Sequence, residues 1–132
     1  MPVATVKQLC TPSSLVTSDS LVEQVAQIED FASGKINGEE FFRRNYFTDG
    51  LRRLVERGFE RLAGKTDDGA FYLTQAMGGG KTHSLIAFGL LAADPKLRKE
   101  VLPRLTTGNE FGAAKVVIFL VSDRGIQSSR MP

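Results

Sequence analysis

One eight-residue segment, QAMGGGKT at residues 75–82, constrains the fold of this chain more than any other feature. It lies between a short apolar run, residues 70–74, and a longer apolar run with helical spacing, residues 80–93. Consecutive glycines leave the backbone bare and permit positive φ angles, so main-chain N–H groups can approach a ligand closely. The first turn of a following helix adds N–H groups and the positive end of the helix dipole. The segment therefore predicts an anion-binding loop between a strand and a helix.

The residue types in this segment are those that hold the phosphates of a nucleotide. The glycines supply the backbone, the ammonium of Lys81 can extend over the β- and γ-phosphates, and the hydroxyl of Thr82 suits Mg²⁺. We therefore expect ATP and Mg²⁺ as cofactors, with Thr82 as the metal-associated residue. The residues expected at the nucleotide are Gly78, Gly79, Gly80, Lys81, Thr82 and His83. The alternative is a flexible glycine turn with an incidental lysine.

The segment departs from the P-loop pattern G-x-x-x-x-G-K-[S/T] at its first position, where Gln75 replaces glycine. That position lies where the strand turns into the loop, so we expect glutamine to be tolerated if its backbone stays in an ordinary region. His83 directly follows the threonine, and a histidine in a first helical turn prefers its neutral form unless a nucleotide is bound. For His83 we favour packing or solvent exposure, with nucleotide contact as the alternative.

Upstream of the loop, the apolar spacing predicts three helices. A capping box at residues 20–23 begins a helical pattern that ends at Gly34. A short helix is expected over residues 39–45. A third helix, capped by Thr48, has one apolar stripe and ends before Gly64.

Two further runs indicate strands. Residues 70–74 are short, aromatic and bounded by turn residues, which favours a strand. Residues 115–121 are continuously β-branched and aliphatic, as in strands buried on both faces of a parallel sheet. Between them, Asp94-Pro95 ends the helix after the loop and can cap a short helix through Val101.

This order predicts an α/β fold of the P-loop NTPase type with an incomplete parallel sheet. The expected organisation is an irregular arm over residues 1–17, a helical N-terminal extension over residues 18–64 and the first part of a nucleotide-binding core over residues 65–132.

Composition and charge narrow the class of protein. The formal net charge of +2 is too small to argue for nucleic acid or an anionic membrane. The single cysteine, Cys10, suits a reducing compartment, and we interpret it as structurally neutral. No apolar run is long enough to span a bilayer, and no signal peptide is evident. We therefore expect a soluble cytoplasmic protein with no membrane partner.

The helix after Thr48 carries a mixed polar face of arginines and glutamates. Because the acids interrupt the arginines, we expect a solvated surface, and a nucleic-acid patch is the alternative. The residues of this face are Arg52, Arg53, Glu56, Arg57, Glu60 and Arg61.

Two separated segments resemble a known family. Residues 41–51 read FFRRNYFTDGL and residues 78–85 read GGGKTHSL, which is similar to bacterial AAA-type ATPases of domain-of-unknown-function family 499. The resemblance spans roughly residues 20–121, the first part of the family's domain. It implies ATP binding by an AAA-type ATPase in DNA-linked, anti-phage or restriction-associated defence, with oligomer and defence partners and only indirect contact with DNA. It also implies that Tyr46 and Thr48 are the nearest candidates for the adenine side.

Hydrolysis requires a further acidic residue at the end of another strand. Asp123 is the downstream candidate, although we favour strand-end capping or a turn for it, and catalytic residues stay unassigned. Because two strands make no stable parallel sheet, we expect the N-terminal piece of a longer ATPase, with weak nucleotide binding and negligible hydrolysis by itself. The competing functions are a small P-loop kinase, for which no lid-like insertion follows the helix, and a fragment that binds DNA or a partner protein.

Overall fold

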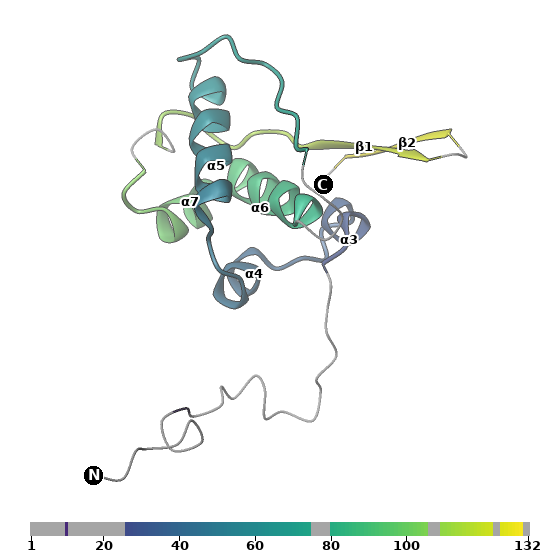
Figure 1. Ribbon diagram of the computed structural model, residues 1–132, viewed down its shortest axis with the longest axis horizontal. Helices are drawn as coiled ribbons and strands as arrows, with labels where there is room; N and C mark the ends of the chain where they lie inside the picture. The colour runs from purple at the N-terminus through teal and green to yellow at the C-terminus, as the bar shows by residue number, and fades with distance from the viewer. Residues whose placement is uncertain (1–9, 11–25, 75–79, 106–108, 123–124, 131–132) are drawn as a thin grey trace.

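The fold is seen in a computed structural model that describes residues 10, 26–74, 80–105, 109–122 and 125–130. Within these ranges, α6 packs against α3, α5 and α7, α4 packs against α7, and the hairpin β1–β2 extends to one side of the helices (Figure 1). The elements are α3 (Ile28–Ala32), α4 (Gly38–Arg44), α5 (Asp49–Leu62), α6 (Lys81–Ala93), α7 (Pro95–Val101), β1 (Val117–Ser122) and β2 (Gly125–Arg130). The expected arm and the capping box at residues 20–23 lie outside the described residues.

Local capping chemistry begins α4, α5 and α7. The hydroxyl of Thr48 accepts a hydrogen bond from the N–H of Leu51 at 3.2 Å, which confirms it as the cap of α5. The carboxylate of Asp94 accepts from the N–H groups of Lys96 at 2.8 Å and Leu97 at 3.2 Å, which confirms the expected short helix. Asn37 caps α4 in the same way, through the N–H of Glu40 at 3.0 Å.

A glycine with a positive φ angle follows each of two helices, α3 and α5. Gly34, after α3, and Gly64, after α5, both have φ of 72°, a left-handed conformation that glycine adopts without a steric penalty. Both were the positions at which the sequence predicted these helices to end.

The core surrounds α6, most of whose apolar residues are buried, whereas Leu85 is 49% exposed. Residues of α3 and α5 are buried against α6, and the ring of Phe31 lies directly over Gly89. A side chain at Gly89 would overlap that ring, so α3 and α6 approach through a glycine contact. The fully buried members of the core include Phe31, Val55, Phe59, Ile86 and Leu91.

A buried arginine, Arg98 of α7, fixes the segment that leads into β1. Its side chain is only 2% exposed, and its Nη2 donates to the carbonyl oxygens of Phe111 at 3.1 Å and Gly112 at 2.7 Å. The guanidinium also lies 3.8 Å from the centroid of the Phe111 ring and 5.5 Å from that of Phe59. Within the described chain, its Nε and Nη1 atoms have no hydrogen-bond partner. Burial lowers the pKa of Arg98, and nearby Asp94 opposes that shift.

The strand expected at residues 115–121 is present, but its surroundings differ from the prediction. It forms β1 and pairs antiparallel with β2, from Val117 opposite Arg130 to Ser122 opposite Gly125. Phe119 and Val121 are 64% and 79% exposed, so β1 is not covered on both faces. The prediction of a parallel neighbour for this strand is therefore wrong. Strands β1 and β2 follow each other in the chain as a hairpin, and a hairpin pairs its strands antiparallel. The P-loop NTPase fold stays a prediction.

The strand expected at residues 70–74 is not formed, which corrects the second strand prediction. These residues have no strand assignment, and the only ladder in the described chain joins β1 to β2. Aromatic and β-branched residues favour a strand only when a neighbouring strand supplies hydrogen bonds and packing. Instead, Tyr72 is 91% exposed and Phe71 is 38% exposed.

Among the described helices, none is long and apolar enough to cross a membrane.

Candidate functional site

The candidate site begins at Gly80, where the chain turns into α6. Gly80 has φ of 77° and ψ of 21°, a left-handed conformation that a residue with a Cβ rarely adopts. Its carbonyl accepts the N–H of Ser84 at 2.8 Å, which closes the first turn. Gln75, Gly78 and Gly79 lie outside the described residues.

The start of α6 carries little negative charge of its own. Gly80 has no side chain to cap the helix, and the first turn contains no acidic residue. By contrast, α4 and α5 begin with a capping side chain and with Glu39 or Asp49 in the first turn. First-turn N–H groups have no intrahelical acceptor, and the helix dipole favours an anion there by about 0.3–1 kcal/mol. The residues at this helix start therefore fit an anionic group such as a phosphate.

Lys81 and Thr82 are the first two residues of α6, so the helix holds both beside Gly80. Lys81 is half-buried and Thr82 is exposed. An ammonium and a hydroxyl at consecutive positions supply a cation for phosphate oxygens and an oxygen ligand for Mg²⁺. Together with His83, the third residue of the helix, four of the six expected residues lie at this helix end.

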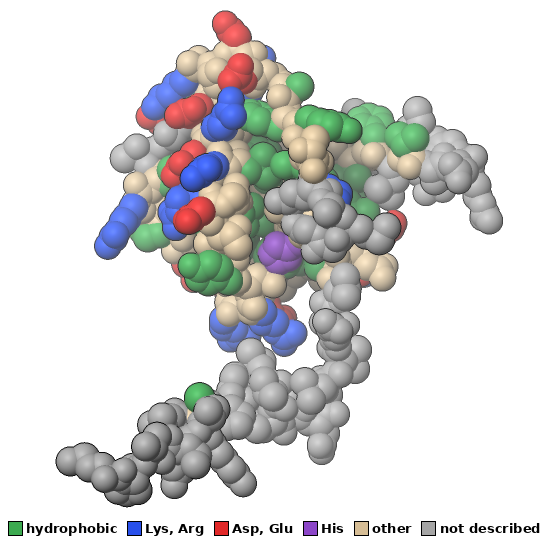
Figure 2. All heavy atoms as spheres, viewed as in Figure 1, with side chains coloured by type: hydrophobic (Ala, Val, Ile, Leu, Met, Phe, Trp, Pro, Cys, Tyr) green, Lys and Arg blue, Asp and Glu red, His purple; other side chains and the backbone are tan. Residues whose placement is uncertain are grey.

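His83 packs against α4. Its imidazole stacks on the ring of Phe41, with centroids 4.7 Å apart and planes inclined by 23°. Burial lowers the pKa of His83, so the neutral ring is favoured. The ring belongs to the chain's single histidine, coloured purple in Figure 2, and it reaches the visible surface. This packing is the interpretation that the sequence favoured, and nucleotide contact stays a prediction.

The two candidates for the adenine side have different environments. The hydroxyl of Thr48 is used in capping α5, which accounts for this residue without a ligand. Tyr46 is 86% exposed, so its ring is accessible to a ligand. Asp123, the candidate metal-associated acid, lies outside the described residues. In the described part of the chain, no three His, Cys, Asp or Glu side chains gather as a metal cluster.

The arginine face of α5 contacts the segment that leads toward the loop. Arg57 lies 3.4 Å from the carboxylate of Asp68 and 5.9 Å from the centroid of the Phe71 ring. Arg61 donates to the carbonyl of Thr66 at 3.0 Å. Basic and acidic side chains alternate over this face of the molecule (Figure 2). Two of the four arginines on this face of α5, Arg57 and Arg61, therefore interact with a carboxylate and a backbone carbonyl of the chain itself.

Sequence reasoning missed these arginines and Arg98 as structural residues. An arginine four positions after Asp94 looks like an ordinary helix-surface residue, and nothing in its spacing marks burial. The aromatic Phe111 was the available signal, because arginine stacks on aromatic faces.

Comparison with known proteins gives one match. The family model described as the DUF499 N-terminal domain matches residues 13–108, a range that contains the candidate site and all five described helices. No curated protein and no solved structure matches the chain.

Proposed function

The chain belongs to the DUF499 family, and on that premise we propose that residues 75–82 form a Walker A loop that binds the phosphates of Mg-ATP. The proposed setting is an AAA-type ATPase in DNA-linked defence, as the likeness of its two motif segments to that family implies. We propose first that this chain binds a nucleotide. We propose second that the binding serves an ATP-driven activity.

The observation that carries the proposal is the geometry of Gly80 at the start of α6. Its left-handed conformation turns the backbone directly into a helix whose first two residues are Lys81 and Thr82. A lysine and a hydroxyl residue directly after a glycine turn are the arrangement that grips a polyphosphate. An incidental lysine after a flexible turn would require neither a hydroxyl residue directly after it nor a helix start without an acid.

Each residue of the proposed site has a separate task. The main-chain N–H groups of Gly78, Gly79 and Gly80 would hold the phosphate oxygens, and Lys81 would neutralise charge on the β- and γ-phosphates. Thr82 offers one oxygen to Mg²⁺, which supplies further charge neutralisation when bound.

His83 supports this site from the side of α4. Its neutral ring adds no positive charge, and its contact with Phe41 fixes the first turn of α6 against the helical core. Asp123 stays a candidate for the metal-associated acid beside strand-end capping or a turn, and the catalytic residues stay unassigned. Nucleic-acid binding through α5 is the second candidate, and the use of Arg57 and Arg61 within the chain weighs against it.

Isothermal titration calorimetry with Mg-ATP tests the proposal. Wild-type protein should bind Mg-ATP, and Lys81→Ala should weaken binding at least tenfold, or about 1.4 kcal/mol. Lys99→Ala, an exposed lysine of α7, is the matched control and should leave the affinity unchanged. Inorganic triphosphate should compete and adenosine should not. Equal affinity in both variants would refute the assignment of Lys81, and salt-dependent DNA binding that survives Lys81→Ala would favour the second candidate.

A further inference from the structure

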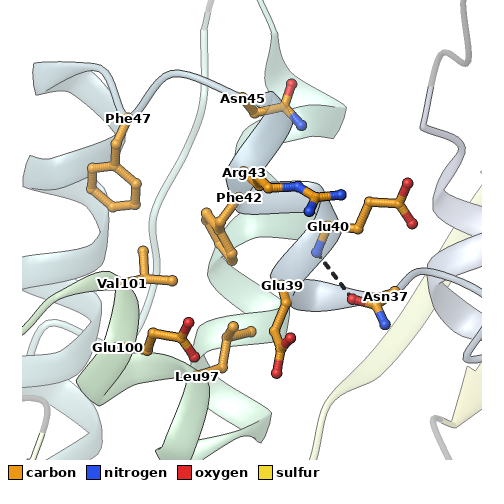
Figure 3. Close-up of a pocket in the computed structure, with 10 residues that line it drawn as sticks. All are labelled: Asn37, Glu39, Glu40, Phe42, Arg43, Asn45, Phe47, Leu97, Glu100 and Val101. Atoms are coloured by element: carbon orange, nitrogen blue, oxygen red, sulfur yellow. Dashed lines mark hydrogen bonds between the residues drawn. The ribbon is translucent and has the colours of Figure 1, made fainter. Parts of the chain in front are cut away.

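A groove between α4 and α7 carries an inference that is independent of the nucleotide site. Its volume is about 730 Å³, and it is lined by residues of both helices and of the segment after α4. The rings of Phe42 and Phe47 and the side chains of Leu97 and Val101 form an apolar floor (Figure 3). The rest of the lining is polar or charged, so the groove suits a partner that brings apolar and charged side chains together.

Two carboxylates mark one end of this floor. Glu39 of α4 and Glu100 of α7 lie on either side of Leu97 (Figure 3), and both side chains are exposed. Within the described residues, neither carboxylate takes part in an ion pair or a hydrogen bond. A partner's cation placed beside these two carboxylates would be attracted by both.

The other charges of the groove leave this negative end in place. Glu40 pairs with Arg44, its neighbour one turn along α4. Arg43 also lines the groove, and Figure 3 shows its guanidinium directed away from the rings of Phe42 and Phe47. A second groove of about 510 Å³ continues from the first, because both are lined by Glu39, Leu97 and Glu100, and its lining adds one acid, Asp94, and one cation, Lys96. Glu39 and Glu100 therefore lie where the two grooves meet.

We propose that this surface docks a basic amphipathic helix of a partner protein. Apolar anchors at helical spacing would lie on Phe42, Phe47 and Val101, and lysine or arginine side chains beside them would meet Glu39 and Glu100. Charge complementarity selects this occupant over an acidic or uncharged one, because covering an exposed carboxylate without supplying a cation weakens binding. This proposal does not depend on nucleotide binding.

Fluorescence anisotropy with a labelled synthetic helix tests the proposal on the full chain. The probe is a 14-residue peptide (a length chosen to give about four helical turns) with leucines at helical spacing and flanking lysines. A matched peptide carries glutamate in place of each lysine. Wild-type protein should bind the lysine peptide saturably, should bind the glutamate peptide at least tenfold more weakly, and should lose affinity as salt rises.

Variants assign the binding to the groove. The double variant Glu39→Gln/Glu100→Gln should weaken the lysine peptide about tenfold. The control Glu29→Gln/Glu60→Gln removes the same charge from exposed positions outside the groove and should leave affinity nearly unchanged. Val101→Thr, which preserves shape, should weaken binding severalfold because it places a hydroxyl on the apolar floor. Circular dichroism checks that each variant is folded.

Four results would overturn the proposal. These are no saturable binding of the lysine peptide, equal losses in both double variants, equal affinity for the glutamate peptide, or a wild-type dimer that Glu39→Gln/Glu100→Gln dissociates in sedimentation. The last result would assign the groove to a second copy of the chain.

Discussion

The imidazole of His83 stacks on the ring of Phe41, with centroids 4.7 Å apart and planes inclined by 23°. The contact joins α4 to the first turn of α6, two elements that lie far apart in the sequence. It also joins the two motif segments, residues 41–51 and 78–85, through which the chain resembles its family. Phe41 of α4 therefore supports the helix that carries the candidate phosphate site.

Stability should fall as the pH falls below about 6.5, the ordinary pKa of histidine. Burial lowers the pKa of His83 in the folded chain, so below pH 6.5 the unfolded chain binds more protons and gains stability relative to the fold. Above pH 6.5 both states hold a neutral ring and the effect vanishes. Urea unfolding at about pH 7.5 and about pH 5.5 measures it.

The matched variant for this effect is His83→Phe, which retains an aromatic ring beside Phe41 and cannot titrate. Because the chain has one histidine, the difference in unfolding free energy between this variant and the wild type should change between the two pH values. A difference that stays constant with pH would show that His83 does not contribute through its titration.

Gly89→Ala should destabilise the fold by about 1–3 kcal/mol, because the added Cβ overlaps the buried ring of Phe31. In a helix interior without such a contact, alanine is normally more favourable than glycine by about 1 kcal/mol. Gly50→Ala in the first turn of α5 is the control, since the nearest atom to a Cβ there is the Thr48 hydroxyl oxygen at 4.0 Å. Thermal unfolding should shift down for the first variant and not for the second; equal shifts would contradict the glycine contact.

Arg98→Lys should cost about 1–3 kcal/mol of unfolding free energy, because an ammonium cannot bond both carbonyls while stacking on Phe111. Arg104→Lys makes the same change at an exposed position and should be nearly neutral. Denaturant unfolding compares the two variants. If Arg98→Lys proved as stable as the control, the paired hydrogen bonds and the ring contact would not stabilise the fold.

Local chemistry accounts for what the sequence predicted correctly. The caps Thr48 and Asp94 and the ending glycine Gly64 act within a few residues of themselves, so their roles are legible in the sequence. The loop glycine Gly80 was predicted by the same logic, and its positive φ agrees with it.

The failures of prediction concern interactions between distant segments. Residues 70–74 have the composition of a strand, but composition does not specify a pairing partner. Residues 115–121 were correctly predicted as a strand and wrongly given a parallel neighbour, since periodicity does not specify the partner or its direction. The burial of Arg98 and the stacking of Phe41 on His83 likewise depend on tertiary packing.

The measurement that tests the central claim most directly is the backbone amide spectrum of ¹⁵N-labelled protein during titration with Mg-ATP. We predict saturable shifts concentrated at Gly78, Gly79, Gly80, Lys81 and Thr82, repeated by inorganic triphosphate and absent with adenosine. Amide shifts confined to other segments, or no shifts up to about 1 mM Mg-ATP, which corresponds to about −4 kcal/mol of binding, would contradict a phosphate site at the start of α6.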